Sequence, residues 1–217
     1  MSDPHLHGPA NIPQNATHAL VCLHGFGDEG ASYLGLQAAL QALLPENVRL
    51  AIACPNGPFP TPFNQGYQWF SDAGWTFNDP TGMAATHTRL ATYLEDLHTG
   101  YTIPYENIAL LGFSQGAMQG LYSIPRLPWP IGGFIACAGA LTPAAKHRPD
   151  PLPHTPMLLL HGVDDDVLPA DKTLEAAQTL TDWGLTVEHH LIPRLAHGIN
   201  NQSLAHIGVF LQTIWKS

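Results

Sequence analysis

The chain has 217 residues, 45% of them hydrophobic and 12% charged, which favours one globular domain spanning residues 1–217. The formal charge is −9, with only eight Lys and Arg residues and no basic cluster, and this argues against a nucleic-acid partner. The N-terminus lacks the charged and apolar regions of a signal peptide, and no apolar run approaches the length of a membrane span. We therefore expect a protein without an integral membrane segment.

The three cysteines, Cys22, Cys54 and Cys137, lie in apolar runs that are typical of buried strands. An odd number of cysteines in such surroundings indicates reduced, buried thiols and a cytoplasmic protein. The alternative, that one of them is a redox-active thiol, stays open.

The predicted elements alternate between short apolar runs and segments with helical spacing of apolar residues. Residues 1–16 are polar and contain proline, which indicates an extended N-terminal lead-in. The predicted strands are 17–23, 49–54, 107–111, 132–140, 157–160 and 186–192. The predicted helices are a segment that ends near Leu44, followed by 84–98, 115–123, 168–183 and 203–215. This alternation predicts an α/β domain with a mainly parallel sheet, in which ligands bind beyond the carboxyl ends of the strands.

The stretch 55–80 interrupts this alternation and is rich in Pro, Gly and aromatic residues. A loop of this length without regular structure is uncommon and usually functional, so we expect an apolar wall beside an active site. The alternative is a surface loop that its own aromatic side chains hold in place.

The sequence Gly112-Phe113-Ser114-Gln115-Gly116 joins the strand predicted at 107–111 to the helix predicted at 115–123. A Gly-x-Ser-x-Gly motif at a strand-to-helix turn is typical of a nucleophilic serine. The turn is so tight that glycine is needed two positions before and two positions after Ser114. Two glycines flanking a serine also occur by chance, so Ser114 needs partners before the motif carries weight.

A serine hydroxyl needs a histidine base, and the base in turn needs a carboxylate that orients it. His197 follows the last predicted strand and lies at the same sheet edge as Ser114, whereas His189 and His190 fall inside a strand and His206 inside a helix. The acid is one of the three aspartates at 164–166, although acids before a helix also act as N-caps. The order Ser, Asp, His along the chain is that of α/β-hydrolases.

An oxyanion hole requires two backbone N–H groups that converge on the reacting carbonyl oxygen. Gln115 supplies one from the N-terminus of its helix, and Phe26 in His24-Gly25-Phe26-Gly27 supplies the second. We expect His24 to shape this turn rather than to act as a catalytic base.

With these residues assembled, the chain resembles the phospholipase/carboxylesterase family of α/β-hydrolases, which includes the acyl-protein thioesterases. The resemblance runs from about Ala19 to Trp215 and also includes the motifs His161-Gly162-Val163-Asp164-Asp165-Asp166-Val167-Leu168-Pro169 and Leu195-Ala196-His197-Gly198. It implies that Asp165 is the acid of the triad, and that the pair Trp69-Phe70 lies beside the site and contacts substrate. Family members often carry an acid directly after this pair, where this chain has Ser71 and then Asp72.

These observations predict a serine carboxylesterase of the α/β-hydrolase fold, with a minimal lid and a small-molecule ester or acyl substrate. Ser114, Asp165 and His197 would form the triad, and Phe26 and Gln115 the oxyanion hole. Alternatives within enzymes are a lysophospholipase and an acyl-protein thioesterase, and the alternative outside enzymes is a hydrolase-fold binding protein without turnover. We expect no cofactor and no metal, because the sequence has no His-Glu-x-x-His, no Cys-x-x-Cys and no phosphate-binding glycine loop with lysine. The oligomeric state, monomer or homodimer, does not follow from the sequence.

Overall fold

The computed structural model describes residues 5–63, 65–71 and 76–216. Within these ranges a seven-stranded sheet has the strand order β1-β3-β2-β6-β7-β8-β9. All neighbouring strands pair in parallel except the first two in this order. The strands are β1 (Ala10–Asn11), β2 (His18–Leu23), β3 (Leu50–Ala53), β6 (Ile108–Phe113), β7 (Gly133–Cys137), β8 (Met157–Gly162) and β9 (Val187–Ile192).

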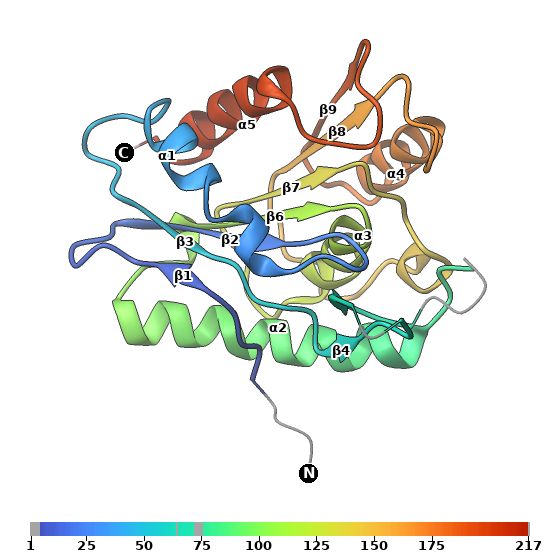
Figure 1. Cartoon of the computed structure of the whole chain (residues 1–217), viewed down its shortest axis with the longest axis horizontal. Helices are drawn as coiled ribbons and strands as arrows, with labels where there is room; N and C mark the ends of the chain where they lie inside the picture. The colour runs from blue at the N-terminus through green and yellow to red at the C-terminus, as the bar shows by residue number, and fades with distance from the viewer. Residues whose placement is uncertain (1–4, 64, 72–75, 217) are drawn as a thin grey trace.

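Helices cover both faces of this sheet (Figure 1). One apolar core lies between the sheet and α2, α3 and α4, and the second lies between the sheet and α1 and α5. The helices are α1 (Leu36–Gln41), α2 (Pro80–Tyr101), α3 (Gln115–Ser123), α4 (Asp171–Asp182) and α5 (Asn201–Ile214), with short 3-10 turns at Gly30–Tyr33, Tyr105–Asn107, Ile124–Arg126 and Pro143–Lys146. The predicted α/β architecture with a mainly parallel sheet is confirmed.

The inner strands are buried on both faces, as is usual for parallel sheets covered by helices. Every residue of β2, β3, β7 and β8 is buried. The edge strand β9 differs, since Ile192 is its only buried residue. The continuous apolar runs of the sequence therefore correspond to the strands in the middle of the sheet.

The described part of the N-terminal lead-in includes a strand, which agrees with the extended segment predicted for residues 1–16 and adds its pairing with the sheet. Ala10–Asn11 adds an antiparallel strand to the edge of β3, and Leu6 is buried. Cys54 N–H also donates to the carbonyl of Pro9 at 2.9 Å. The lead-in therefore covers an otherwise open sheet edge. Residues 1–4 lie outside the described residues.

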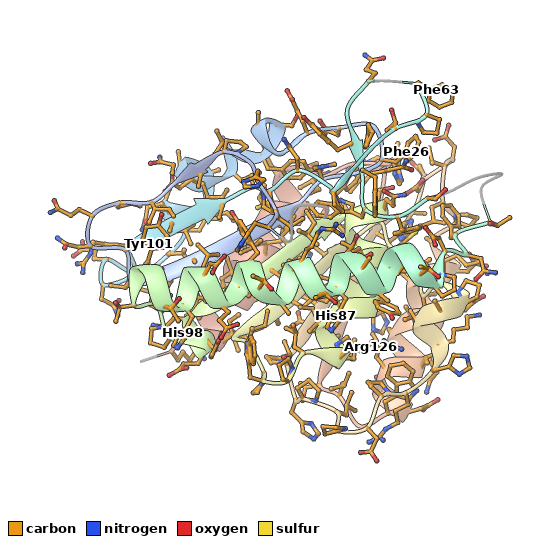
Figure 2. All side chains as sticks on the ribbon, turned by 90° about the horizontal axis from the view of Figure 1, so that it is seen from below. Phe26, Phe63, His87, His98, Tyr101 and Arg126 are labelled. Atoms are coloured by element: carbon orange, nitrogen blue, oxygen red, sulfur yellow. The ribbon has the colours of Figure 1, made fainter. Side chains whose placement is uncertain are left out.

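The described part of the 55–80 loop contains a two-stranded hairpin, β4 (Phe59–Pro60) and β5 (Tyr67–Gln68). Phe63 lies in the turn of this hairpin with 79% of its surface exposed. Figure 2 shows Phe63 on the same side of the molecule as Phe26, at the end of α2 opposite Tyr101. Asp72 and Trp75 of the same loop lie outside the described residues.

Candidate active site

Ser114 lies in the turn between β6 and α3 with a backbone φ of 52° and ψ of −117°. This conformation is strained for a residue with a side chain, and such strain is concentrated at functional sites. Its N–H donates to the carbonyl of Cys137 on the neighbouring β7 at 2.9 Å. A Cβ atom on Gly116 would lie 2.3 Å from the carbonyl oxygen of Leu23, so only glycine lets α3 begin this close to β2. The sheet and the helix together fix the turn.

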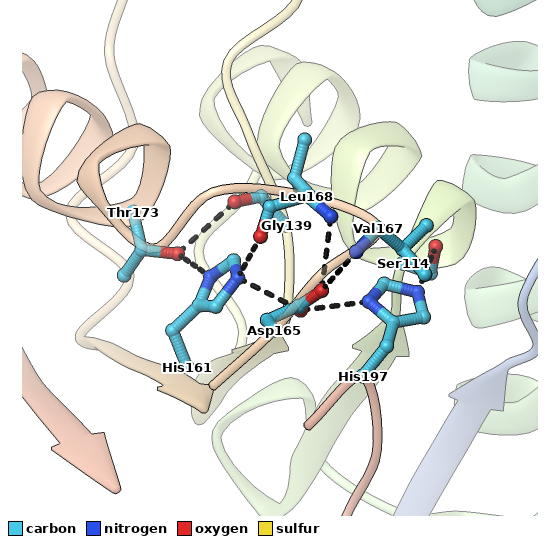
Figure 3. A network of polar contacts seen from close by, with 8 residues as sticks. All are labelled: Ser114, Gly139, His161, Asp165, Val167, Leu168, Thr173 and His197. Atoms are coloured by element: carbon cyan, nitrogen blue, oxygen red, sulfur yellow. Dashed lines mark hydrogen bonds and ion pairs between the residues drawn. The ribbon is translucent and has the colours of Figure 1, made fainter. Parts of the chain in front are cut away.

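The structure brings Ser114, His197 and Asp165 together at the carboxyl ends of the strands (Figure 3). His197 Nε2 lies 2.9 Å from the Ser114 hydroxyl, and His197 Nδ1 lies 2.7 Å from Asp165 Oδ2. Since an ionised carboxylate only accepts hydrogen bonds, Nδ1 carries the ring proton and Nε2 is free to accept the serine proton. The arrangement can therefore turn the hydroxyl into a nucleophile.

Two further contacts hold the Asp165 carboxylate in place. Its Oδ1 atom accepts the backbone N–H groups of Val167 and Leu168, each at 2.9 Å, and its side chain is fully buried. Burial by itself raises the pKa of Asp165, but the N–H group of Leu168, the side chain of His197 and the N–H group of Val167 outweigh it, so the pKa lies below its usual value. Asp165 is therefore ionised and fixed in orientation.

The other candidates for these roles lie elsewhere. Asp164 and Asp166 are exposed, and the residue that caps α4 is Ala170 without a side-chain hydrogen bond. His190 contacts Glu188 at 2.6 Å and stacks on His206 at a centroid distance of 4.0 Å, at the outer edge of the sheet. Only Asp165 of the three adjacent aspartates contacts His197.

The segment with Phe26 runs beside Ser114, as an oxyanion hole requires. A Cβ atom on Gly25 would lie 3.6 Å from Ser114 Cβ, and Gly27 N–H donates to the carbonyl of Tyr67 at 2.9 Å. Gln115 is the first residue of α3, where backbone N–H groups have no partner within the helix. The helix dipole favours negative charge at this end.

His24 is fully buried and supports the same turn. Its Nδ1 lies 2.7 Å from the carbonyl of Gly25, and its Nε2 accepts the N–H of Gly57 at 2.9 Å. Burial lowers the pKa of His24, which keeps the ring neutral in these two roles. Both ring nitrogens of His24 thus pair with backbone groups other than Ser114, in line with the turn-shaping role predicted for it.

Trp69 and Phe70 differ from their predicted role, because both side chains are completely buried and so cannot contact a substrate. Their backbone is held by the Gln115 side chain, which accepts the N–H of Trp69 at 2.9 Å and donates to the carbonyl of Phe70 at 3.0 Å. The Trp69 indole N–H donates to the carbonyl of His24 at 2.7 Å. The pair therefore holds the turn after β2 and the start of α3 in place from within the core.

Two hollows are lined by residues of the site or by their neighbours along the chain. One, of about 370 Å³, lies beside His197 and is lined by Tyr33, Leu36, Phe113, Ile199 and Leu204, with Asp28 also in its wall. The other, of about 220 Å³, is lined by the apolar side chains of Phe77, Met118, Leu141 and Leu168, with Lys146 and Lys172 also in its wall.

The structure adds two residues that sequence reasoning did not single out, His161 and Thr173. His161 Nε2 lies 3.0 Å from Asp165 Oδ2, and His161 Nδ1 lies 2.7 Å from the Thr173 hydroxyl. The only signal in the sequence was the place of His161 four residues before Asp165. Within the described residues, no group of three or more His, Cys, Asp or Glu side chains is placed to hold a metal ion, and no helix is long and apolar enough to cross a membrane.

Comparison with known proteins agrees with this geometry. A family model described as Phospholipase/Carboxylesterase matches residues 10–215. The chain belongs to the Phospholipase/Carboxylesterase family. The resemblance predicted from the sequence motifs is thereby confirmed.

Related proteins match most or nearly all of the chain. Acyl-protein thioesterase 1 of Candida albicans is 27% identical over 95% of both chains. Carboxylesterase SOBER1 of Arabidopsis thaliana is 27% identical over 87% of this chain and 86% of its own length. The crystal structure of esterase PE8 superimposes with a TM-score of 0.85 at 29% identity, over 97% of this chain and 99% of that one. The predicted α/β-hydrolase fold is confirmed as well.

Proposed function

We propose that the protein is a serine carboxylesterase in which Ser114 is the nucleophile, His197 the general base and acid, and Asp165 the residue that orients His197. The observation that carries this proposal is the continuous chain of contacts from Asp165 Oδ2 through His197 to the Ser114 hydroxyl. The names of the related esterases and of the thioesterase support the same class of reaction.

The proposed reaction has two halves. Ser114 Oγ bonds to the ester carbonyl carbon while its proton passes to His197 Nε2, and the negative charge moves to the carbonyl oxygen. The N–H groups of Phe26 and Gln115 stabilise this oxyanion, a contribution of about 3–4 kcal/mol per donor in well-studied serine hydrolases. The bond to the leaving oxygen then breaks as His197 returns the proton to it, and water releases the acid by the same steps.

The two hollows suggest how the substrate lies. Because His197 must reach the leaving oxygen to protonate it, we assign the hollow beside His197 to the alcohol part of the ester. The second hollow, between Phe77, Met118 and Leu168, would then take the acyl group. Lys146, Lys172 and Glu175 line part of this hollow, and charged side chains disfavour the apolar tail of a long acyl chain, so short or medium chains are favoured.

This proposal is tested by hydrolysis of para-nitrophenyl esters from acetate to palmitate. We expect the highest kcat/KM at short or medium chains, and a loss of at least about 10³-fold in Ser114→Ala and in His197→Gln. His206→Gln is the matched control, because His206 lies on the outer side of the sheet edge, and it should keep full activity. Turnover that survives in Ser114→Ala would rule out Ser114 as the nucleophile.

A thioester substrate is the second candidate, favoured by the similarity to acyl-protein thioesterase 1 of Candida albicans along the whole chain. The triad attacks a thioester carbonyl in the same way, so the two activities differ only in the leaving group. Acyl-coenzyme A and an S-acylated peptide, compared with the matching oxygen esters, separate them by kcat/KM.

We also propose a cytoplasmic location. Cys22, Cys54 and Cys137 are buried free thiols. Free thiols are usual in compartments that keep cysteine reduced. Burial raises the pKa of Cys137 to about 12, which argues against a redox role for this thiol.

A further inference from the structure

We infer that His161 is a positioning residue that donates a hydrogen bond from Nε2 and locks Asp165 in the orientation that His197 needs. This inference rests on the proposed serine esterase function. The side chains of Asp165 and His161 both have 0% exposure. No water can therefore supply the hydrogen bonds that this carboxylate requires.

Four donors surround the Asp165 carboxylate. Val167 and Leu168 N–H groups occupy Oδ1, while His197 Nδ1 at 2.7 Å and His161 Nε2 at 3.0 Å occupy Oδ2 (Figure 3). A carboxylate has about four acceptor positions, so these contacts saturate it. His161 supplies the only one of the four that comes from β8 itself.

The neighbours of His161 Nε2 show that this nitrogen is a donor. It lies 3.0 Å from Asp165 Oδ2 and 2.8 Å from the carbonyl oxygen of Leu168. An ionised carboxylate and a backbone carbonyl can only accept. The proton on Nε2 is therefore shared between Asp165 and Leu168, which ties both ends of the 165–168 loop to one ring.

The Thr173 hydroxyl holds the other ring nitrogen, Nδ1. Its oxygen lies 2.7 Å from Nδ1 and 3.0 Å from the carbonyl oxygen of Gly139. A hydroxyl can donate or accept, so it can pair with Nδ1 whether or not this nitrogen carries a proton. Both ring nitrogens are therefore held by partners, as is usual for buried polar groups, and the plane of the ring is fixed.

The Nε2 N–H group therefore faces the buried carboxylate in a fixed direction. This hydrogen bond offsets part of the desolvation of Asp165, and Thr173 fixes the ring to α4. Without it, the carboxylate would lose a donor and the 165–168 loop would lose its anchor at Leu168. His197 would then sample orientations in which Nε2 no longer faces Ser114.

The first test is kinetic. We expect His161→Phe, which keeps the ring shape without its nitrogens, to lower kcat about 10- to 100-fold with little change in KM, as a small misplacement of a catalytic group does. His161→Gln, which can still donate toward Asp165 and Leu168, should recover most of the loss, and Thr173→Val should lie in between. His189→Phe on the exposed edge strand is the matched control and should have normal kcat. A normal kcat in folded His161→Phe contradicts the inference.

The second test does not depend on activity. Nitrogen chemical shifts of the histidine rings in labelled wild-type protein report whether each ring nitrogen bears a proton. We expect His161 Nε2 to bear a proton, and a shift at Nδ1 in Thr173→Val. A bare Nε2 overturns the inference even if the esterase proposal stands, whereas an inactive wild-type enzyme with a protonated Nε2 overturns the esterase proposal alone.

Discussion

At the scale of single residues, the site depends on positions where a side chain would not fit. Ser114 holds a positive φ, and the glycines two positions before and after it let β6 and α3 meet at the turn. A Cβ on Gly112 would lie 2.5 Å from the carbonyl oxygen of Gly116. Strain of this kind persists only where the surrounding structure enforces it.

Gly116→Ala is therefore expected to damage both fold and activity. The added Cβ would lie 2.3 Å from the carbonyl oxygen of Leu23 and 2.6 Å from that of His24, and neither backbone group can move without shifting the turn that carries Phe26. We expect a loss of about 1–3 kcal/mol in the free energy of unfolding, measured by urea denaturation. Ester hydrolysis should fall with it.

The matched control for this change is Gly100→Ala near the end of α2. A Cβ there meets no atom within 4 Å, so alanine should be neutral or stabilise the helix by up to about 1 kcal/mol. Equal urea midpoints for the two variants would mean that the close approach at Gly116 is not a constraint on the fold.

A site residue could be predicted from the sequence when a short motif around it pointed to its role. Ser114 and His197 follow strands within short motifs, and Asp165 needed the family pattern to separate it from its neighbours. The roles of His161 and Thr173 could not be predicted, because their contact arises from the packing of α4 against β8. The same limit applied to Trp69 and Phe70, since aromatic residues beside a site can equally well form its core.

At the scale of elements, the apolar runs predicted the inner strands well, because strands buried on both faces are apolar without interruption. The ends of the helices were harder to predict from the sequence. The helix predicted at 84–98 spans Pro80–Tyr101, because Asp79 caps it by accepting the N–H of Gly82 at 2.8 Å and proline follows at the first position. The strands Ala10–Asn11, β4 and β5 are two residues long and leave no periodic signal.

At the scale of the whole molecule, the sheet brings residues from distant parts of the chain to one edge. β6 lies between β2 and β7, so the turn after β6 is flanked by the turn that carries Phe26. β8 and the turn after β9 then add Asp165 and His197. Strand order is not encoded in any local pattern, and only the rule on carboxyl ends of parallel strands predicted that these turns would meet.

Two buried histidines, at the start of β2 and just after its end, make stability depend on pH. Burial lowers the pKa of His18 and of His24 in the folded protein. As the pH falls below about 6.5, the unfolded chain takes up protons at these residues before the folded protein does, so folding stability decreases. The lowered pKa of Asp165 extends the loss to more acidic pH.

We therefore expect a lower Tm at about pH 5.5 than at about pH 7.5, measured by scanning calorimetry at constant ionic strength. Each kcal/mol of lost stability corresponds to about 2–4 °C in a protein of this size. His24→Gln, which removes one of these titrating groups, should make the dependence shallower. A Tm that rises as the pH falls over this interval would contradict the assignment of neutral, buried histidines.

Whether Ser114 is an activated nucleophile is tested by reaction with a fluorophosphonate followed by intact mass spectrometry. We expect one adduct per chain, located on Ser114 by peptide mapping, absent in Ser114→Ala and much slower to form in His197→Gln, while His206→Gln reacts at the wild-type rate. A wild-type protein that does not react, or an adduct that persists in Ser114→Ala, would contradict it.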